Sequence, residues 1–161
     1  MAALIKFEDT VSYRLGRVTT AFRSSLERCM GQIGLHRGLR GRLHGGQVFV
    51  LFELWNQDGL KQRDLADRLS VAAPTINKMV AGLVKLGLVS NSRLEDDARS
   101  TRIFLTEDGI RIREAIERQW VDLEESCLSG LTETERLVLH DLLGKLKSTY
   151  TGRSEPSDED D

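Results

Sequence analysis

A chain of 161 residues is long enough for one domain, or for one compact subunit with extended arms. Its composition is 40% hydrophobic and 30% charged, which is typical of a soluble globular protein, and without an 18-residue apolar run we expect no membrane span. The first residues form no continuous apolar core, so no signal peptide is predicted. Cys29 and Cys127 lie far apart and form no CxxC motif, which favours a reduced, cytoplasmic protein.

The formal net charge of −2 conceals an uneven distribution. Residues 14–42 hold seven arginines against one acid, a sum of +6, and residues 59–105 hold eight bases against five acids, a sum of +3. Residues 106–150 hold six bases against ten acids, and residues 151–161 one base against five, so each sums to −4. Because local field governs phosphate binding more than total charge does, a nucleic-acid partner remains compatible with the acidic total.

Hydrophobic residues near the N-terminus recur every three or four positions and predict one long amphipathic helix over residues 3 to about 33. Such a helix must bury its stripe against another element. The stripe consists of Leu4, Phe7, Val11, Leu15, Val18, Phe22, Leu26 and Cys29.

Residues 36–46 are basic and glycine-rich, and we interpret them as a connector. A solvated loop is the favoured reading, and phosphate contact is the functional alternative. The next helix is predicted over 48–56, with Val48, Leu51, Phe52 and Trp55 facing inward. Asp58 and Gly59 then turn the chain.

Two short helical patterns follow, at 63–69 and from Pro74 to about Leu86, separated by a short break. Proline fits the first position of a helix, and Gly87 can end the second helix with a positive φ. Two helices joined by so tight a turn predict a helix-turn-helix. The residues of the second helix expected to face a core are Ile76, Met79, Val80, Leu83 and Val84.

The opposite face of the second helix contains no acid. A helix that enters the major groove needs an outer face that does not repel phosphate and that offers donors and acceptors to base edges. An ordinary solvated face is the alternative. The residues on this face are Thr75, Asn77, Lys78, Ala81 and Lys85.

Two β-prone runs, 88–89 and 102–105, enclose a polar segment and predict a hairpin, which would make the unit a winged helix. Arg99 lies at the expected tip, with Arg93 and Arg102 on either side, and an arginine on a thin loop can enter a minor groove. The adjacent acids at 95–97 are expected to be solvated or to brace the wing. A metal site is disfavoured because no His or Cys lies nearby.

Two helices are predicted after the hairpin. Thr106 caps one of about 20 residues, whose stripe ends at Cys127, and a capping box at 132–135 opens the last. The apolar face of the last helix comprises Leu139, Leu142, Leu143, Leu146 and Tyr150.

A set of short motifs in the central stretch points to one known family. The motifs are Leu65-Ala66, Pro74-Thr75-Ile76-Asn77-Lys78, Leu86-Gly87-Leu88-Val89 and Asp97-Ala98-Arg99 followed by Leu105-Thr106 and Gly109. In this combination the chain resembles the multiple-antibiotic-resistance regulators, the MarR family, over about residues 47–110.

The resemblance implies DNA-binding roles for particular residues. Thr75, Asn77 and Lys78 would contact the major groove, Arg99 would reach the minor groove, and Asp97 would brace the wing. Two positions depart from the family pattern. Ser90-Asn91-Ser92 stand where a basic residue is usual, so that Arg93 would supply the charge slightly later, and Lys61 stands where a helix cap is usual.

We therefore expect a mainly α protein with a small β-wing. Residues 36–105 would form the winged helix-turn-helix DNA-binding region, and residues 1–35 and 106–150 a helical dimerisation region. Residues 151–161, rich in acids, would be a disordered acidic tail.

The expected function is that of a DNA-binding transcriptional regulator, a homodimeric repressor that a small molecule releases from a pseudo-palindromic operator. Tyr13, Arg17, His44 and Trp55 are weak candidates for the effector site. A thiol redox switch through Cys29 and a winged-helix module that binds protein are the alternatives.

Catalysis is not expected. The three histidines, at 36, 44 and 140, are scattered, and no nucleophile motif, phosphate loop or metal-ligand spacing accompanies them, so no cofactor is predicted.

Overall fold

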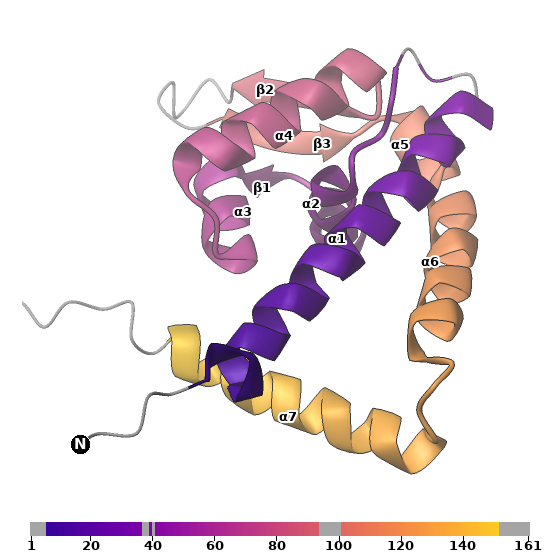
Figure 1. The fold of residues 1–161 in the computed structure, drawn as a ribbon. Helices are drawn as coiled ribbons and strands as arrows, with labels where there is room; N and C mark the ends of the chain where they lie inside the picture. The colour runs from indigo at the N-terminus through magenta and orange to yellow at the C-terminus, as the bar shows by residue number, and fades with distance from the viewer. Residues whose placement is uncertain (1–5, 37–38, 40, 94–100, 152–161) are drawn as a thin grey trace, which may run out of the picture. The chain divides into compact units, whose positions relative to one another are not determined.

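The computed structural model describes residues 6–36, 39, 41–93 and 101–151. The chain is mainly helical with one small sheet, and it divides into two compact units, residues 1–123 and 124–161 (Figure 1). In chain order the elements are η1 (Phe7–Asp9), α1 (Val11–His36), α2 (Gly45–Asn56), β1 (Leu60–Lys61), α3 (Gln62–Leu69), α4 (Ala73–Leu86), β2 (Val89–Arg93), β3 (Thr101–Leu105), α5 (Glu107–Arg111), α6 (Arg113–Leu128) and α7 (Glu133–Thr151).

The single helix expected over residues 3 to 33 is wrong at its start. A 3₁₀ turn, η1, comes first, and α1 begins only after Thr10, whose backbone is extended. The Thr10 hydroxyl accepts a hydrogen bond from the N–H of Tyr13 at 3.3 Å, as a helix N-cap does. The first residues of the predicted helix, 3–5, lie outside the described part of the chain.

The next helix, α2, begins at Gly45, three residues before the predicted start. Two side chains satisfy backbone N–H groups at this end, which offsets the low helix propensity of glycine. The carboxylate of Glu27, on α1, accepts the N–H of Gly45 at 2.7 Å, and the amide oxygen of Gln47 accepts the N–H of His44 at 2.9 Å. A side chain 18 residues away thus contributes a cap to the start of α2.

Glu27 also interacts with two side chains of the connector, His44 and Arg42. His44 Nδ1 lies 2.6 Å from one carboxylate oxygen, and Arg42 Nε lies 3.7 Å from the same oxygen. Partial burial raises the pKa of the Glu27 carboxyl, but the hydrogen bonds from Gly45 and His44 and the charge of Arg42 outweigh it, so that the pKa is lowered overall. The ionised carboxylate therefore links α1 to the start of α2.

The predicted helix-turn-helix is confirmed as α3 and α4, joined by a three-residue turn in which Ser70 has φ +52°. Pro74 is the second residue of α4, not the first, because Ala73 already belongs to the helix. Gly87 ends α4 with φ +77°, as predicted.

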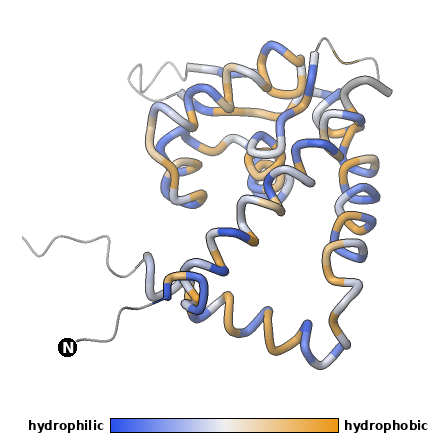
Figure 2. The backbone as a smooth tube through the Cα atoms, in the orientation of Figure 1, coloured by the Kyte–Doolittle hydropathy of each residue, from blue (hydrophilic) through white to orange (hydrophobic). Residues whose placement is uncertain are grey.

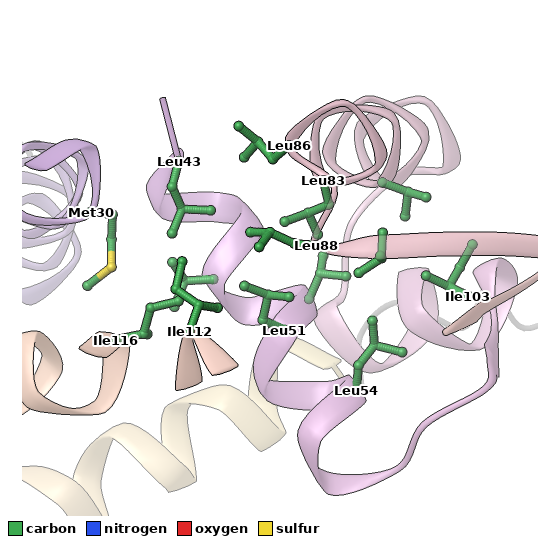
Figure 3. Packing of buried hydrophobic residues seen from close by; sticks show 14 of the residues in the cluster. Met30, Leu43, Leu51, Leu54, Leu83, Leu86, Leu88, Ile103, Ile112 and Ile116 are labelled. Carbon is green, nitrogen blue, oxygen red and sulfur yellow. The ribbon is translucent and has the colours of Figure 1, made fainter. Parts of the chain in front are cut away.

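One face of α4 packs into the core. Figure 3 shows buried side chains of this core, among them Leu83 of α4, Leu51 of α2 and Ile103 of β3. Each fully buried side chain of this size contributes about 1.5–3 kcal/mol relative to an exposed one. Met79 is half-buried, and the prediction for Val84 is wrong, since it is 38% exposed. The buried residues of α4 are Ile76, Val80, Leu83 and Leu86.

The hairpin is confirmed and extends into a three-stranded antiparallel sheet of order β1-β3-β2. Val89 pairs with Leu105 and Leu60 with Ile103. The sheet is tied to the following helix by Thr106, whose hydroxyl donates to the carbonyl of Gly87 at 2.6 Å and accepts the N–H of Gly109 at 3.0 Å. The predicted cap at the start of α5 therefore also closes the base of the wing.

The helix predicted after Thr106 is divided at Ile112 into α5 and α6. Aromatic side chains from α1, α2 and α6 meet in one cluster, in which the rings of Phe52 and Trp120 lie 5.0 Å apart. Trp55 donates its indole N–H to the carbonyl of Gly109 at 3.0 Å, which bears out its expected structural role. The cluster comprises Phe22, Phe49, Phe52, Trp55 and Trp120.

The second unit contains α7, which the predicted capping box opens. The N–H of Thr132 donates to the Glu135 carboxylate at 2.8 Å, and Thr132 Oγ1 accepts the N–H of Glu135 at 3.3 Å. Hydrophobic residues recur along the whole of α7 (Figure 2), and several are exposed. Cys127, expected on a buried stripe, is exposed as well. The exposed residues of α7 are Leu137, Val138, Leu142, Leu143 and Tyr150.

Within the described residues, no helix combines the length and the apolar character that a membrane crossing requires.

We predict that Glu27→Gln destabilises the protein at pH 7 by about 1 kcal/mol, the usual contribution of a helix-capping side chain. Because the folded-state pKa of Glu27 lies below 4.5, the ionised form adds stability above that pH, and this contribution is lost as the pH falls through the folded-state pKa. The difference between the variant and the wild type in thermal unfolding should therefore shrink below pH 4.5.

Glu117→Gln, on the exposed Arg113–Glu117 pair of α6, is the matched control and should change stability little at any pH. A Glu27→Gln defect that persists unchanged into acid would contradict the assignment.

Candidate nucleic-acid interface

The outward face of α4 has the composition predicted for it. All five residues are exposed, and α4 contains no acid over its 14 residues. Lys78 and Lys85 place two positive charges on this face. The residues are Thr75, Asn77, Lys78, Ala81 and Lys85.

The orientation of α4 is set by a close approach to α2. Gln47 of α2 is a buried polar side chain, 5% exposed, and its amide donates to the carbonyl of Met79 at 3.5 Å. The same amide lies so close to Gly82 that any side chain at that position would collide with it. The opposite face of α4 is consequently the one left to solvent.

A side-chain contact that the sequence did not predict joins the two helices of the helix-turn-helix. Gln62, the first residue of α3, donates its amide N–H to the amide oxygen of Asn77 at 2.5 Å. Gln62 is half-buried and Asn77 is exposed. The two residues are 15 positions apart, and no periodicity or motif connects them.

The structure reaches the base of the wing but not its tip. Arg93 pairs with Thr101 at the end of the hairpin. Arg99 and Asp97 lie outside the described residues, so their expected roles stay predictions. Arg102 is used by the fold, because it donates to the carbonyl of Gly59 at 2.8 Å.

The connector contributes less free charge to the surface than its composition indicates. Arg42 donates to the backbone carbonyl of Glu27 at 3.2 Å and lies beside its carboxylate, with which His44 also pairs. Phosphate contact through these two side chains would have to compete with Glu27. Arg37 and Arg40 lie outside the described residues.

The structure does not gather the four candidates for an effector site. Tyr13 and Arg17 are exposed one turn apart on α1, while His44 is held at Glu27, about 15 Å further along α1 from Arg17. Trp55 belongs to the aromatic cluster, with the guanidinium of Arg113 5.7 Å from its ring centroid.

The remaining candidates have ordinary surroundings. Cys29 is half-buried and packs against the core. The helix α7 carries His140 at its surface. In the described part of the chain, the His, Cys, Asp and Glu side chains form no group that could hold a metal ion.

Comparisons with known proteins agree with the fold and with the motifs. Residues 44–101 match the model of the MarR family, and this range extends from the N-cap of α2 to the first residue of β3. An uncharacterised helix-turn-helix transcriptional regulator of Bacillus subtilis, YdgJ, is 22% identical over 148 residues, which cover 92% of this chain and 84% of that protein.

Solved structures extend the likeness to the terminal helices. The PcaV transcriptional regulator of Streptomyces coelicolor, solved with its natural ligand, has a TM-score of 0.75 at 23% identity over 91% of this chain and 97% of its own. MepR of S. aureus, solved as a complex with DNA, has a TM-score of 0.73 at 25% identity over 87% and 98%. Residues 44–101 thus match the MarR family, and the chain shares its winged helix-turn-helix fold with these solved structures.

Proposed function

We propose that the protein is a cytoplasmic homodimer that binds a pseudo-palindromic site in double-stranded DNA and represses transcription until a small molecule releases it. The observation that carries the proposal is the outward face of α4, which is exposed, acid-free and fixed by burial of the opposite face. MepR, a protein of the same fold, was solved as a complex with DNA, which supports DNA as the partner.

The side chains on this face divide between two tasks. Thr75 and Asn77 lie in the first turns of α4 and offer a hydroxyl and an amide, which can hydrogen-bond base edges in the major groove. Lys78 and Lys85 supply positive charge for phosphates. Arg99 at the wing tip would contact the minor groove, with Asp97 as its brace and Arg93 adding charge at the base.

Dimerisation is proposed from apolar surface that a single chain leaves exposed. Leu137 of α7 is 68% exposed, and Phe7 and Val11 near the N-terminus are exposed to a similar degree. Exposed apolar surface on this scale marks an interaction site. A two-fold axis would place two α4 helices about 34 Å apart, one turn of DNA, with residues 1–35 and 106–150 as the dimerisation region.

An effector can release DNA only by binding more tightly to a form whose α4 spacing does not fit the operator. The four candidates Tyr13, Arg17, His44 and Trp55 do not form one site, and of these we propose His44 as the effector contact because it pairs with Glu27, which joins α1 to the start of α2. PcaV was solved with its natural ligand, which supports ligand binding by a protein of this fold.

Lys78→Ala should weaken binding to all duplexes by a similar factor and reduce the slope of log affinity against log salt by about 1, because one phosphate contact is lost. The measurement is a fluorescence-anisotropy titration at several salt concentrations. Arg118→Ala, an exposed residue of α6 paired with Glu114, is the control and should leave the slope unchanged. A wild-type protein whose duplex affinity does not depend on salt would favour a protein-binding module instead.

Arg99→Ala should weaken binding most for sites with a narrow, A·T-rich minor groove, since the negative potential that attracts arginine is strongest there. Affinities for two duplexes that share the major-groove contacts but differ in this flanking sequence would measure the effect. Equal losses on both duplexes would mean that Arg99 contacts phosphate only.

Replacing Leu142 and Leu143 together by Glu should shift the protein from dimer to monomer, because the paired surface would have to bury two charges. Sedimentation equilibrium should give twice the chain mass of 18.1 kDa for the wild type and the mass of a single chain for the variant. The control replaces the exposed Glu124 and Glu125 of α6 by Gln, which changes the net charge by two but places no charge on an apolar face. A monomeric wild type at micromolar concentration would end the dimer proposal.

A further inference from the structure

The Asn77 side chain already accepts a hydrogen bond within the protein, which limits how it can hydrogen-bond a base edge. Gln62 Nε2 donates to Asn77 Oδ1 at 2.5 Å. Gln62 begins α3 and Asn77 lies in the second turn of α4, so the contact bridges the two helices next to the proposed reading face. Gln62 is half-buried, which restricts the positions its side chain can take.

This contact determines which end of the Asn77 amide is turned toward solvent. An asparagine amide has one acceptor oxygen and two N–H donors. Gln62 takes one of the two lone pairs of Oδ1 and holds this oxygen toward α3, so the Nδ2 group is the end expected to face outward. A freely rotating asparagine, by contrast, can use both ends at once on adenine, accepting from N6 and donating to N7.

We propose that Gln62 is a specificity-determining residue that acts through Asn77, fixing it as a hydrogen-bond donor toward the major groove. The base it selects is then one with strong acceptors, guanine with O6 and N7 or thymine with O4. This proposal rests on the proposed function, since it assigns the base preference of the same surface. Gln62 is a positioning residue here and need not touch the base itself.

If the contact between Gln62 and Asn77 only stabilised the packing of α3 on α4, its loss would have a different effect. Loss of such a packing contact lowers stability and weakens binding to every duplex in the same proportion. Loss of an orienting contact instead changes the rank order of bases at one position of each half-site. The chemistry of Gln62 allows the order to be inverted, because a carboxylate in its place accepts hydrogen bonds and cannot donate them.

The test measures base preference with a randomised-duplex selection followed by titrations on four duplexes that differ at the selected position. For the wild type we expect guanine or thymine at that position. Gln62→Ala should move the preference toward adenine by about tenfold, because Asn77 can then use both ends of its amide. Asn77→Ala should remove the preference, and the double variant should match Asn77→Ala alone.

Gln62→Glu should invert the preference. The carboxylate accepts from Asn77 Nδ2 and turns Oδ1 outward, which favours the donors adenine N6 and cytosine N4. Gln119→Ala, which removes an amide from the surface of α6, should leave the preference unchanged. Thermal unfolding of each variant checks that the fold persists.

The outcomes separate the inference from the function on which it rests. A wild type that selects no duplex overturns DNA binding itself. A wild type that binds a defined site, with Gln62→Ala and Gln62→Glu keeping its base preference, overturns the role of Gln62 alone. A double variant that differs in preference from Asn77→Ala would show that Gln62 does not act through Asn77.

Discussion

The fold depends on the burial of one face of α4. Ile76, Val80 and Leu83 are almost completely buried against α2 and the sheet, and this packing fixes the rotation of the helix about its axis. A helix turned by a third of a revolution would expose leucine and bury lysine, at a cost of several kcal/mol. The exposed face is therefore a consequence of the core, and its acid-free composition matters because the core holds it outward.

The elements that could be predicted from the sequence are those that local signals define. The apolar period of α4, the glycine with positive φ after it, and the capping residues Thr106 and Thr132 each act within a few positions of the chain. Together with the β-prone runs at 88–89 and 102–105, these signals located the helix-turn-helix, the hairpin and the last helix. Val84 is the exception in α4, because the period of a helix does not determine how wide its buried stripe is.

The features that the sequence could not predict depend on partners distant in the chain. The strand β1 has only two residues and exists because Leu60 pairs with Ile103. Glu27, 18 residues before Gly45, caps the early start of α2, and Gln62 donates a hydrogen bond to Asn77, 15 residues further along the chain. Polar contacts of this kind have no periodicity, so they become visible only once the fold brings the residues together.

The first turn of α2 connects the long helix to the proposed reading helix. On one side Glu27 of α1 accepts the N–H of Gly45, and two positions later Gln47 donates to the carbonyl of Met79 on α4. Because Gly82 has no side chain, the Gln47 amide fits against it, and a Cβ at position 82 would collide with that amide. Both contacts involve the first turn of α2, so Glu27 of α1 and Met79 of α4 are linked through residues two positions apart. A ligand that separated Glu27 from its partners would act on the helical turn that also contacts α4, and a contiguous physical link of this kind is one route for control at a distance.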